Sequence, residues 1–327
     1  MARKRILSGM RPTGPLHLGN LHGALANWKS MQDDYECFFF IADWHALTTD
    51  YDATTPIQGY IVDVFLDWLS VGLSPEKCTL FIQSHIKEHA ELFLLLSMIT
   101  PLPWLERNPT YKEQIAQLKN RDLSNFGFLG YPVLQAADII MYKANGVPVG
   151  IDQAPHVELT REIARRFNYF YGDIFPVPET ILTETSKILG LDRRKMSKSY
   201  NNAIFLSDPP DEVRRKVSEM ITDPQRARRT DPGDPAVCNV FSFHQLYSDQ
   251  ETVHRVDQEC RGAKIGCVEC KQMMAENLIR VLGPIREKRS YYEAHPDTVG
   301  AIIEDGDQKA RAVARKTMEE VRAAVKI

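Results

Sequence analysis

Residues 5–28 read RILSGMRPTGPLHLGNLHGALANW and join an apolar segment to a helical one through a glycine-containing turn. The run RILSG (5–9) is short and apolar, as expected of a buried strand. In residues 16–28 apolar side chains recur mostly at three- and four-residue spacing, which predicts a helix with one buried face. A strand followed directly by a helix is the building unit of a parallel α/β sheet.

The rest of the chain divides into two parts of different pattern. CFFFIADWHAL (37–47) and VPVGID (147–152) are typical of further buried strands. Helical periods fall at residues 56–71, 90–100, 110–120, 133–144 and 154–167, and from about residue 208 onward only helical patterns occur. We therefore predict an α/β fold, with a parallel-sheet domain over residues 1–205 and an all-helical domain over residues 206–327. The last helix is a candidate for packing back on the first domain.

Composition limits the classes of partner. The 327 residues are 43% hydrophobic and 25% charged, and their formal net charge is −3. Because this balance gives no overall positive field, contact with nucleic acid must come from local basic patches. The candidate patches are Arg161, Arg165 and Arg166, then Arg226, Arg228 and Arg229, and the basic face of the last helix. The most apolar stretch, residues 60–73, contains two aspartates and is too short to cross a bilayer, so we expect a cytoplasmic protein with no membrane partner.

The turn after the first strand contains the segment HLGN, residues 17–20. His17 and Asn20 bring polar groups to the N-terminus of the predicted helix, where free N–H groups and the helix dipole favour phosphate. The glycine spacing differs from the dinucleotide fingerprint G-x-G-x-x-G, which weakens the case for a hydride-transfer enzyme. An ordinary glycine-rich turn is the alternative interpretation.

A second candidate segment is DRRKMSKSYNN, residues 192–202. Lys195 and Lys198 stand three residues apart among small polar side chains, which suit a mobile loop. Two ammonium groups on such a loop can follow negative charge as it develops on a polyphosphate. The alternative is a charged loop that is simply solvated.

Together, HLGN and KMSKS resemble the two signatures of class I aminoacyl-tRNA synthetases. Asn20 stands where many of these families have histidine, and it keeps a hydrogen-bond donor there. Further segments resemble the bacterial tryptophanyl-tRNA synthetase family, in order along most of the chain: residues 8–20, 42–51, 130–168 and 222–235.

This resemblance implies a Rossmann-like catalytic core, a helical tRNA-binding domain, a homodimer, and ATP, Mg²⁺, L-tryptophan and tRNA(Trp) as substrates and partners. It assigns the catalytic roles to His17, Asn20, Lys195 and Lys198. The implied ATP-binding residues are Met10, Arg11, Thr13, Gly19, Asn20, Gly150, Asp152, Gln153, Lys195, Met196, Ser197 and Lys198. A tyrosine-specific class I synthetase and a nucleotidyltransferase that does not use tRNA are the competing functions.

The implied tryptophan pocket centres on Asp138. An indole N–H is a donor only and needs an acceptor, and an aspartate inside an apolar helical run is unfavourable without a partner. The alternative role for Asp138 is a core residue that caps a neighbouring turn. The other implied pocket residues are Tyr131, His45, Gln135 and Gln153. Since a phenol O–H is also a donor, Asp138 alone does not separate tryptophan from tyrosine.

Six cysteines fall into two groups. Cys37 and Cys78 lie singly in apolar surroundings and are expected in the core. The other four, Cys238, Cys260, Cys267 and Cys270, follow the spacing C-x21-C-x6-C-x2-C. In a reducing cytoplasm such a cluster favours metal ligation over disulfides. A [4Fe–4S] cluster is the leading interpretation, with zinc and unligated thiols as alternatives. The arrangement resembles an iron–sulfur subset of the bacterial family, except that the first spacing is one residue shorter.

Overall fold

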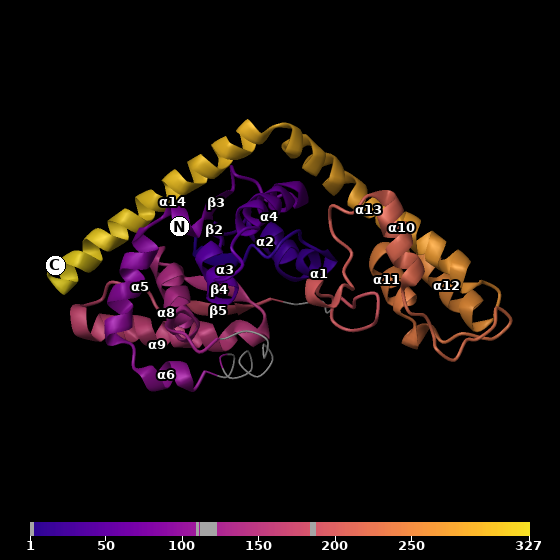
Figure 1. The fold of residues 1–327 in the computed structure, drawn as a ribbon, viewed down its shortest axis with the longest axis horizontal. Coiled ribbons are helices and arrows are strands. Elements are labelled where there is room, and N and C mark those ends of the chain that lie inside the picture. Colours follow the sequence, from indigo (N-terminus) through magenta and orange to yellow (C-terminus); the bar gives the residue numbers. More distant parts are fainter. Residues whose placement is uncertain (1–2, 109–110, 112–122, 184–187) are drawn as a thin grey trace. The chain divides into compact units, whose positions relative to one another are not determined.

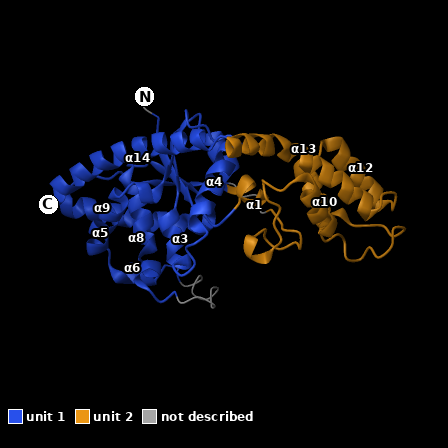
Figure 2. Cartoon of the chain, turned by 45° about the horizontal axis from the view of Figure 1, so that its top comes forward, with its two compact units in different colours: residues 1–14, 24–185, 295–327 blue, residues 15–23, 186–294 orange. Residues whose placement is uncertain are grey.

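The computed structural model describes residues 3–108, 111, 123–183 and 188–327, and the chain forms two compact units. Unit 1 contains residues 1–14, 24–185 and 295–327, and unit 2 contains residues 15–23 and 186–294 (Figure 2). This division differs from the expected boundary at residue 205. The turn after the first strand belongs with the KMSKS segment, because Leu18 N donates to Ile204 O at 3.0 Å and Leu206 N donates to Leu16 O at 2.9 Å.

Unit 1 is built on a five-stranded parallel sheet with the strand order β3-β2-β1-β4-β5 (Figure 1). The strands are β1 (Arg5–Met10), β2 (Glu36–Ile41), β3 (Cys78–Ile82), β4 (Gly146–Val149) and β5 (Glu179–Leu182). The predicted α/β class with a parallel sheet is therefore confirmed. The chain adds strands on one side of β1 and then on the other, so the direction of winding reverses between β1 and β4. In such sheets, ligands bind beyond the carboxyl ends of the strands at this reversal.

Helices cover the sheet of unit 1. They are α2 (Ala26–Met31), α3 (Asp43–Asp50), α4 (Ile57–Val71), α5 (Glu88–Ile99), α6 (Leu102–Glu106), α8 (Phe126–Met141), α9 (Ala154–Tyr171) and α14 (Pro296–Val325). Successive side chains of β2 point to opposite faces of the sheet. Phe39 stacks on Trp28 of α2 with ring centroids 4.5 Å apart, whereas Phe38 lies 5.0 Å from Tyr142 at the end of α8. Both faces of the sheet are thus packed.

Several sequence predictions about these elements need correction. The segment 37–47 is not one strand, because β2 ends at Ile41 and α3 begins at Asp43. Strands β3 and β5 were not predicted. Residues 18–31 are helical but interrupted: α1 (Leu18–Asn20) is followed by a π-helical turn (Leu21–Leu25) and then by α2. The predicted helical segment 110–120 falls almost wholly outside the described residues.

The C-terminal helix α14 packs on the edge strand β3. A Cβ atom at Gly306 would lie 1.8 Å from the carbonyl oxygen of Leu80, so only glycine lets the helix approach the strand this closely. Beside it, Asp307 Oδ1 accepts a hydrogen bond from Ile82 N at 3.1 Å. Helix α14 therefore covers an edge that would otherwise present unpaired backbone groups.

Unit 2 is helical. Besides α1, its helices are α10 (Pro210–Glu219), α11 (Asn239–Tyr247), α12 (Gln250–Arg261) and α13 (Cys267–Ala294), and α13 packs against both α10 and α11.

No helix in the described part of the chain is both long enough and apolar enough to span a membrane.

Candidate active site and cysteine cluster

In unit 1, three side chains converge on the fully buried carboxylate of Asp138. His45 Nε2 lies 2.8 Å from Oδ2, and His89 Nδ1 lies 2.6 Å from Oδ1. Gln83 Nε2 donates to both oxygens, at 2.8 and 2.9 Å. These donors come from the beginning of α3, from α5 and from the turn that follows β3, so the fold brings them to Asp138 of α8 from three directions.

The contacts decide the charge of Asp138. Burial by itself raises the pKa of this carboxyl, but the hydrogen bonds from His45 and His89 outweigh it, and the net pKa lies below its ordinary value. Asp138 is therefore an ionised acceptor in a site closed to water. The sequence singled out Asp138 and His45, but it did not single out Gln83 or His89.

Tyr131, one of the predicted pocket residues, is oriented by a buried histidine. Tyr131 Oη lies 3.2 Å from His156 Nε2, and the amide nitrogen of Asn108 lies 3.2 Å from His156 Nδ1. Since the Asn108 amide donates to Nδ1, His156 carries its proton on Nε2 and donates to Tyr131 Oη. Burial lowers the pKa of His156 to about 4 and raises the pKa of Tyr131 to about 12. A neutral Tyr131 hydroxyl therefore keeps its own hydrogen to donate. The His45 and Tyr131 rings lie 6.4 Å apart, centroid to centroid.

The other predicted residues of unit 1 follow β1 and β4, which pair with each other. Met10 ends β1, and Arg11 and Thr13 follow it, both exposed. Gly150 precedes a short 3₁₀ turn (Ile151–Gln153) that leads from β4 into α9, and Gln153 Nε2 donates to Asp152 Oδ2 at 3.1 Å. Gln135 is half-buried on α8, three residues before Asp138. These residues thus lie near the strand ends where the winding of the sheet reverses, the expected ligand edge.

In unit 2, His17 caps helix α1. Its Nδ1 accepts from Gly19 N at 3.1 Å, and Asn20 Oδ1 accepts from His17 N at 3.0 Å. This is a reciprocal capping box with histidine in place of serine or threonine. A Cβ atom at position 19 would lie 2.9 Å from the imidazole ring, so glycine is required for the ring to sit over the helix start.

The KMSKS segment is held by Asn202, a residue to which the sequence assigned no role. Its Oδ1 accepts from Ser197 N at 2.8 Å, and its Nδ2 donates to Asp192 Oδ1 at 2.7 Å and to Lys195 O at 3.3 Å. Met196 is buried beneath the loop, and Lys195 is exposed. The two motifs touch, because a Cβ atom on the glycine of HLGN would be 3.7 Å from Met196 Cβ.

The charges of the two lysines reach His17. Burial, followed by the positive charges of Lys198 and Lys195, lowers the pKa of His17 to about 4. The imidazole is consequently neutral near pH 7, as its acceptor role in the helix cap also requires. HLGN and KMSKS together form a polar, positively charged site suited to a polyphosphate.

Most of the predicted basic patches are committed to contacts inside unit 1. Arg165 pairs with Glu162, and Arg166 Nε donates to Ile99 O at 2.6 Å. On α14, Arg322 forms two hydrogen bonds to Glu91 of α5, at 2.7 and 2.5 Å. The basic face of the last helix therefore docks that helix on its own unit.

The four clustered cysteines lie at the ends of helices in unit 2. Cys238 precedes α11, Cys260 lies at the end of α12, and Cys267 and Cys270 lie in the first turn of α13. Burial, followed by the charges of the other three sulfurs, raises the pKa of Cys270 to about 12. Among the described residues, however, no group of three or more His, Cys, Asp or Glu side chains is arranged as closely as metal binding requires.

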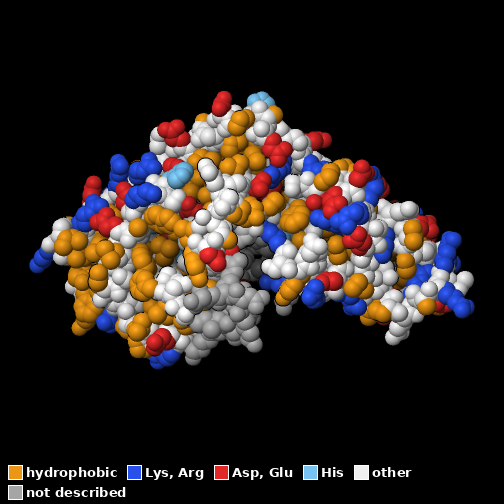
Figure 3. All heavy atoms as spheres, in the orientation of Figure 1, with side chains coloured by type: hydrophobic (Ala, Val, Ile, Leu, Met, Phe, Trp, Pro, Cys, Tyr) orange, Lys and Arg blue, Asp and Glu red, His pale blue; other side chains and the backbone are white. Residues whose placement is uncertain are grey.

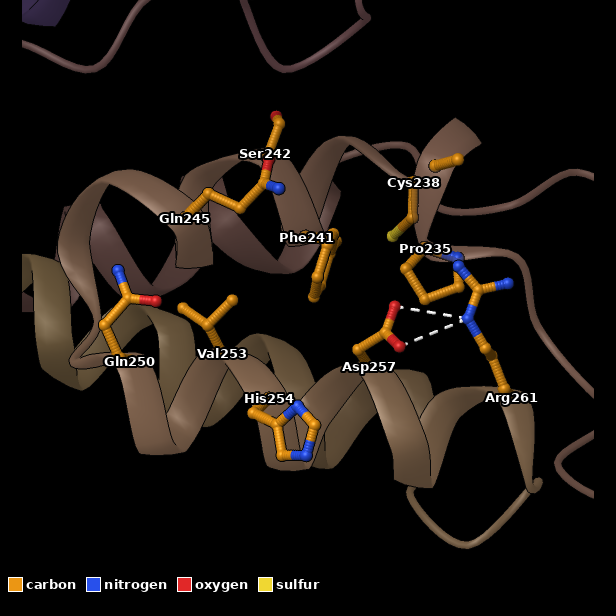
Figure 4. A pocket seen from close by; sticks show the side chains of 11 residues that line it. Pro235, Cys238, Phe241, Ser242, Gln245, Gln250, Val253, His254, Asp257 and Arg261 are labelled. Atoms are coloured by element: carbon orange, nitrogen blue, oxygen red, sulfur yellow. Dashed lines mark hydrogen bonds and ion pairs between the residues drawn. The ribbon is translucent and has the colours of Figure 1, made fainter.

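A guanidinium group stands among the sulfurs. Arg226 Nη1 lies 3.6 Å from Cys260 Sγ and 3.9 Å from Cys267 Sγ. The backbone also approaches closely, because a Cβ atom at Gly233 would be 2.6 Å from Cys260 Sγ. Cys238 lines a pocket of about 600 Å³ beside α11 and α12, into which Asp257 and Arg261 also project as a hydrogen-bonded pair (Figure 4).

The doubly wound parallel sheet, the histidine-capped helix after its first strand and the lysine loop that reaches this histidine define a class I aminoacyl-tRNA synthetase. Comparison with known families agrees, because residues 2–283 match the family described as tRNA synthetases class I (W and Y).

Comparison with individual proteins narrows this class. The tryptophan–tRNA ligase of Thermotoga maritima is 53% identical over 99% of both chains, and that of Aquifex aeolicus is 47% identical over 99% of this chain and all of its own. The solved tryptophanyl-tRNA synthetase of Campylobacter jejuni, complexed with ADP and tryptophan, has a TM-score of 0.92 at 32% identity, covering 99% of this chain and 100% of its own. The chain belongs to the tryptophan–tRNA ligase family.

Proposed function

We propose that this member of the family activates L-tryptophan with ATP to give tryptophanyl-adenylate and pyrophosphate, and then transfers tryptophan to the 3′-terminal adenosine of tRNA(Trp). The choice of amino acid rests on the full-length similarity to tryptophan–tRNA ligases, 53% identical in Thermotoga maritima. The buried, ionised carboxylate of Asp138 supports it as an acceptor suited to a donor-only indole N–H. The complex of the Campylobacter jejuni relative with ADP and tryptophan supports the same pair of ligands.

The activation step needs positioning and charge stabilisation more than proton transfer. A tryptophan carboxylate oxygen attacks the α-phosphorus of ATP, a new P–O bond forms, and the bond to the bridging oxygen of the β-phosphate breaks. Since the nucleophile is already an anion, no general base is required. Lys195 and Lys198 are assigned to the charge on the departing pyrophosphate, and neutral His17 and the amide of Asn20 to the phosphates.

Mg²⁺ would act from the phosphate oxygens of ATP and neutralise part of their charge. Gly150 and Asp152 are assigned to the ribose and Arg11 to a phosphate, and Met10 and Thr13 are further proposed ATP contacts. In the amino-acid pocket, Asp138 accepts the indole N–H, the Tyr131 hydroxyl and Gln153 meet the backbone groups of tryptophan, and His45 and Gln135 line the ring.

Aminoacylation of a tRNA(Trp) transcript tests the whole function. Purified enzyme should attach radiolabelled tryptophan to the transcript and should leave tyrosine and phenylalanine unattached. Attachment of tyrosine instead would overturn the choice of amino acid. Activation without transfer to any tRNA would point to a nucleotidyltransferase that does not use tRNA.

We further propose that Cys238, Cys260, Cys267 and Cys270 hold a [4Fe–4S] cluster in the helical unit. Four cysteine thiolates are the donor set for such a cluster, and these four lie at neighbouring helix ends of one unit. Burial raises the pKa of Cys260, and the guanidinium of Arg226, 3.6 Å from Cys260 Sγ, opposes this effect by favouring the thiolate form. When bound, the cluster would tie together the ends of α11, α12 and α13.

Iron and sulfide analysis of anaerobically purified protein, with a visible spectrum, tests the cluster. We expect four irons and four sulfides per chain with a brown colour. A colourless protein with one zinc per chain would show the zinc alternative, and a colourless, metal-free protein would show unligated thiols.

An apolar surface supports a homodimer. On unit 1 the exposed hydrophobic side chains include Met98 at 72% and Phe126 at 67% exposure, and hydrophobic side chains gather on the visible face of this unit (Figure 3). Phe126 also lines a mainly apolar pocket of about 470 Å³ between the beginning of α8 and α3. Exposed patches of this kind mark association surfaces, and we propose that a second copy of the chain covers this one. None of the six cysteines forms a disulfide, which fits the reducing cytoplasm that we propose as the location.

A further inference from the structure

Gln83 occupies an unusual place beside the proposed tryptophan site. It is fully buried on the turn that follows β3. Its amide NH₂ donates to both oxygens of Asp138, and its Oε1 accepts from Trp44 N at 3.2 Å. A single amide that bonds both carboxylate oxygens restricts rotation of the carboxylate, and its own oxygen is fixed to the start of α3. Gln83 thus sets the direction in which Asp138 offers its lone pairs.

The segment that carries Gln83 is held by the C-terminal helix. Asp307 of α14 accepts from Ile82 N at 3.1 Å through Oδ1, and its Oδ2 lies 2.5 Å from His85 Nδ1. Arg311 Nη2, one turn further along α14, donates to His85 O at 3.1 Å. The residues on both sides of Gln83 are therefore fixed by a helix more than 220 residues later in the sequence.

We propose that Gln83 is a positioning residue for Asp138 as the indole acceptor, and that α14 holds Gln83 in place through Asp307. The inference rests on the proposed function, because it takes Asp138 to be the group that meets the indole N–H. It makes the last helix part of the amino-acid site, although no α14 residue in the described part of the chain hydrogen-bonds to the carboxylate.

A buried carboxylate keeps its charge and direction through the donors around it. Loss of Gln83 would leave Asp138 with His45 and His89 alone and free the carboxylate to rotate. We expect the substitution to weaken the binding of tryptophan. The rate of the chemical step should stay nearly unchanged, because that step depends on the HLGN and KMSKS residues. The effect should also depend on the indole N–H itself.

Pyrophosphate exchange with two amino acids tests this role. The probes are tryptophan and 3-(benzothiophen-3-yl)alanine, in which sulfur replaces the indole N–H. For Gln83→Met, which keeps the length but removes the donor, we expect the KM for tryptophan to rise about 10- to 100-fold. The kcat should change less than about twofold, and the KM for the analogue should stay at its wild-type value. If this variant does not fold, Gln83→Asn withdraws the amide by one methylene and should give the same pattern.

The contribution of α14 is tested with a matched set of variants. Asp307→Ala removes the acceptor for Ile82 N and should raise the KM for tryptophan in the same selective way. Asp307→Asn retains an acceptor oxygen and should restore a near wild-type KM. Arg322→Gln breaks the ion pair between the same helix and α5, and it should leave the KM unchanged.

The results that would contradict the proposal differ from one another. A wild-type enzyme that does not distinguish tryptophan from the analogue would remove Asp138 as the indole acceptor, and the inference would fall with that part of the proposed function. If the wild type discriminates and Gln83→Met discriminates equally well, only the positioning role is overturned. Equal losses for both amino acids would show a merely structural residue, and a wild-type KM in Asp307→Ala would overturn the role of α14.

Discussion

Asp138 shows how a folded chain can keep a buried charge away from water. An unpaired buried carboxylate would take up a proton, but His45, His89 and Gln83 together supply donors to both of its oxygens. Tyr131 is held in a similar way. Neutral His156 donates to the Tyr131 hydroxyl oxygen, so the hydroxyl hydrogen of Tyr131 stays available for a ligand. Both groups thus have a defined protonation state in the folded chain.

The first prediction for a single residue concerns Lys195. Replacement by alanine removes one cation from the developing pyrophosphate, and loss of one electrostatic group of this kind lowers kcat by about 10²- to 10³-fold. Tryptophan affinity should stay at the wild-type value because the lysine belongs to the phosphate site. Single-turnover adenylate formation and equilibrium tryptophan binding measure the two quantities. An unchanged rate would remove Lys195 from the site.

The second prediction concerns the pKa of His17. Its pKa should be about 4, far below the ordinary value of 6.5, because of burial and then of Lys198 and Lys195. Removing a neighbouring positive charge makes protonation easier, so Lys198→Ala should raise this pKa part of the way toward 6.5. NMR titration of the imidazole measures both values. A wild-type His17 that titrates near 6.5 would contradict the proposed environment.

The sequence identified some of these residues and missed others for a physical reason. His17, Lys195 and Lys198 lie in short motifs whose composition is itself informative. Gln83, His89 and His156 are single polar residues between apolar ones, and their roles appear only when partners such as Asp138, 55 positions from Gln83, are brought into contact. Long-range contacts of this kind leave no local signal.

At the scale of elements, helix α14 packs closely on the edge strand β3 because residue 306 is glycine. A Cβ atom at Gly306 would lie 1.8 Å from Leu80 O, and backbone cannot yield as a flexible side chain can. Gly306→Ala should therefore lower the free energy of unfolding by about 1–3 kcal/mol, the usual effect of overpacking.

Gly300 supplies the control for this prediction. It lies on the same helix, and a Cβ atom there would meet nothing within 4 Å. Gly300→Ala should be neutral or stabilising by up to about 1 kcal/mol, because alanine is the better helix former. Urea denaturation measures both variants. Equal stability of the two would contradict the close approach of α14 to β3.

Element boundaries were the weaker part of the sequence prediction. The apolar run 37–47 does not reveal that β2 ends at Ile41, because the helix that follows is apolar too. β5 has only four residues, and β3 follows a helix that is itself strongly apolar. Hydrophobic periodicity separates long helices from strands well, but short buried strands carry too few residues for it.

For the whole molecule, the predicted change of pattern near residue 205 does not coincide with the compact units. Residues 15–23 belong to unit 2 although they follow the first strand, whereas the place of residues 295–327 in unit 1 agrees with the expected packing of the last helix on the first domain. A linear sequence shows where composition changes, but it does not show that a short segment joins another unit through backbone pairs such as Leu18 N to Ile204 O.

The oligomeric state gives a prediction at this scale. Met98→Glu places a charge in the exposed apolar surface of unit 1 and should convert the dimer to a monomer, because an unpaired charge is unfavourable in an apolar interface. Ile221→Glu changes an exposed hydrophobic residue of unit 2, 42% accessible, and should leave the dimer intact. Sedimentation equilibrium distinguishes the two states. A wild-type monomer, or a dimer that survives Met98→Glu, would contradict this interface.

Amino-acid-dependent ATP–pyrophosphate exchange tests the central claim most directly, because it needs only the enzyme, Mg²⁺, ATP, pyrophosphate and one amino acid. Run in parallel with tryptophan, tyrosine and phenylalanine, it should show rapid exchange with tryptophan and background exchange with the other two. Exchange driven by tyrosine, or none with tryptophan, would contradict the assignment of Asp138 and of the HLGN and KMSKS site to tryptophan activation.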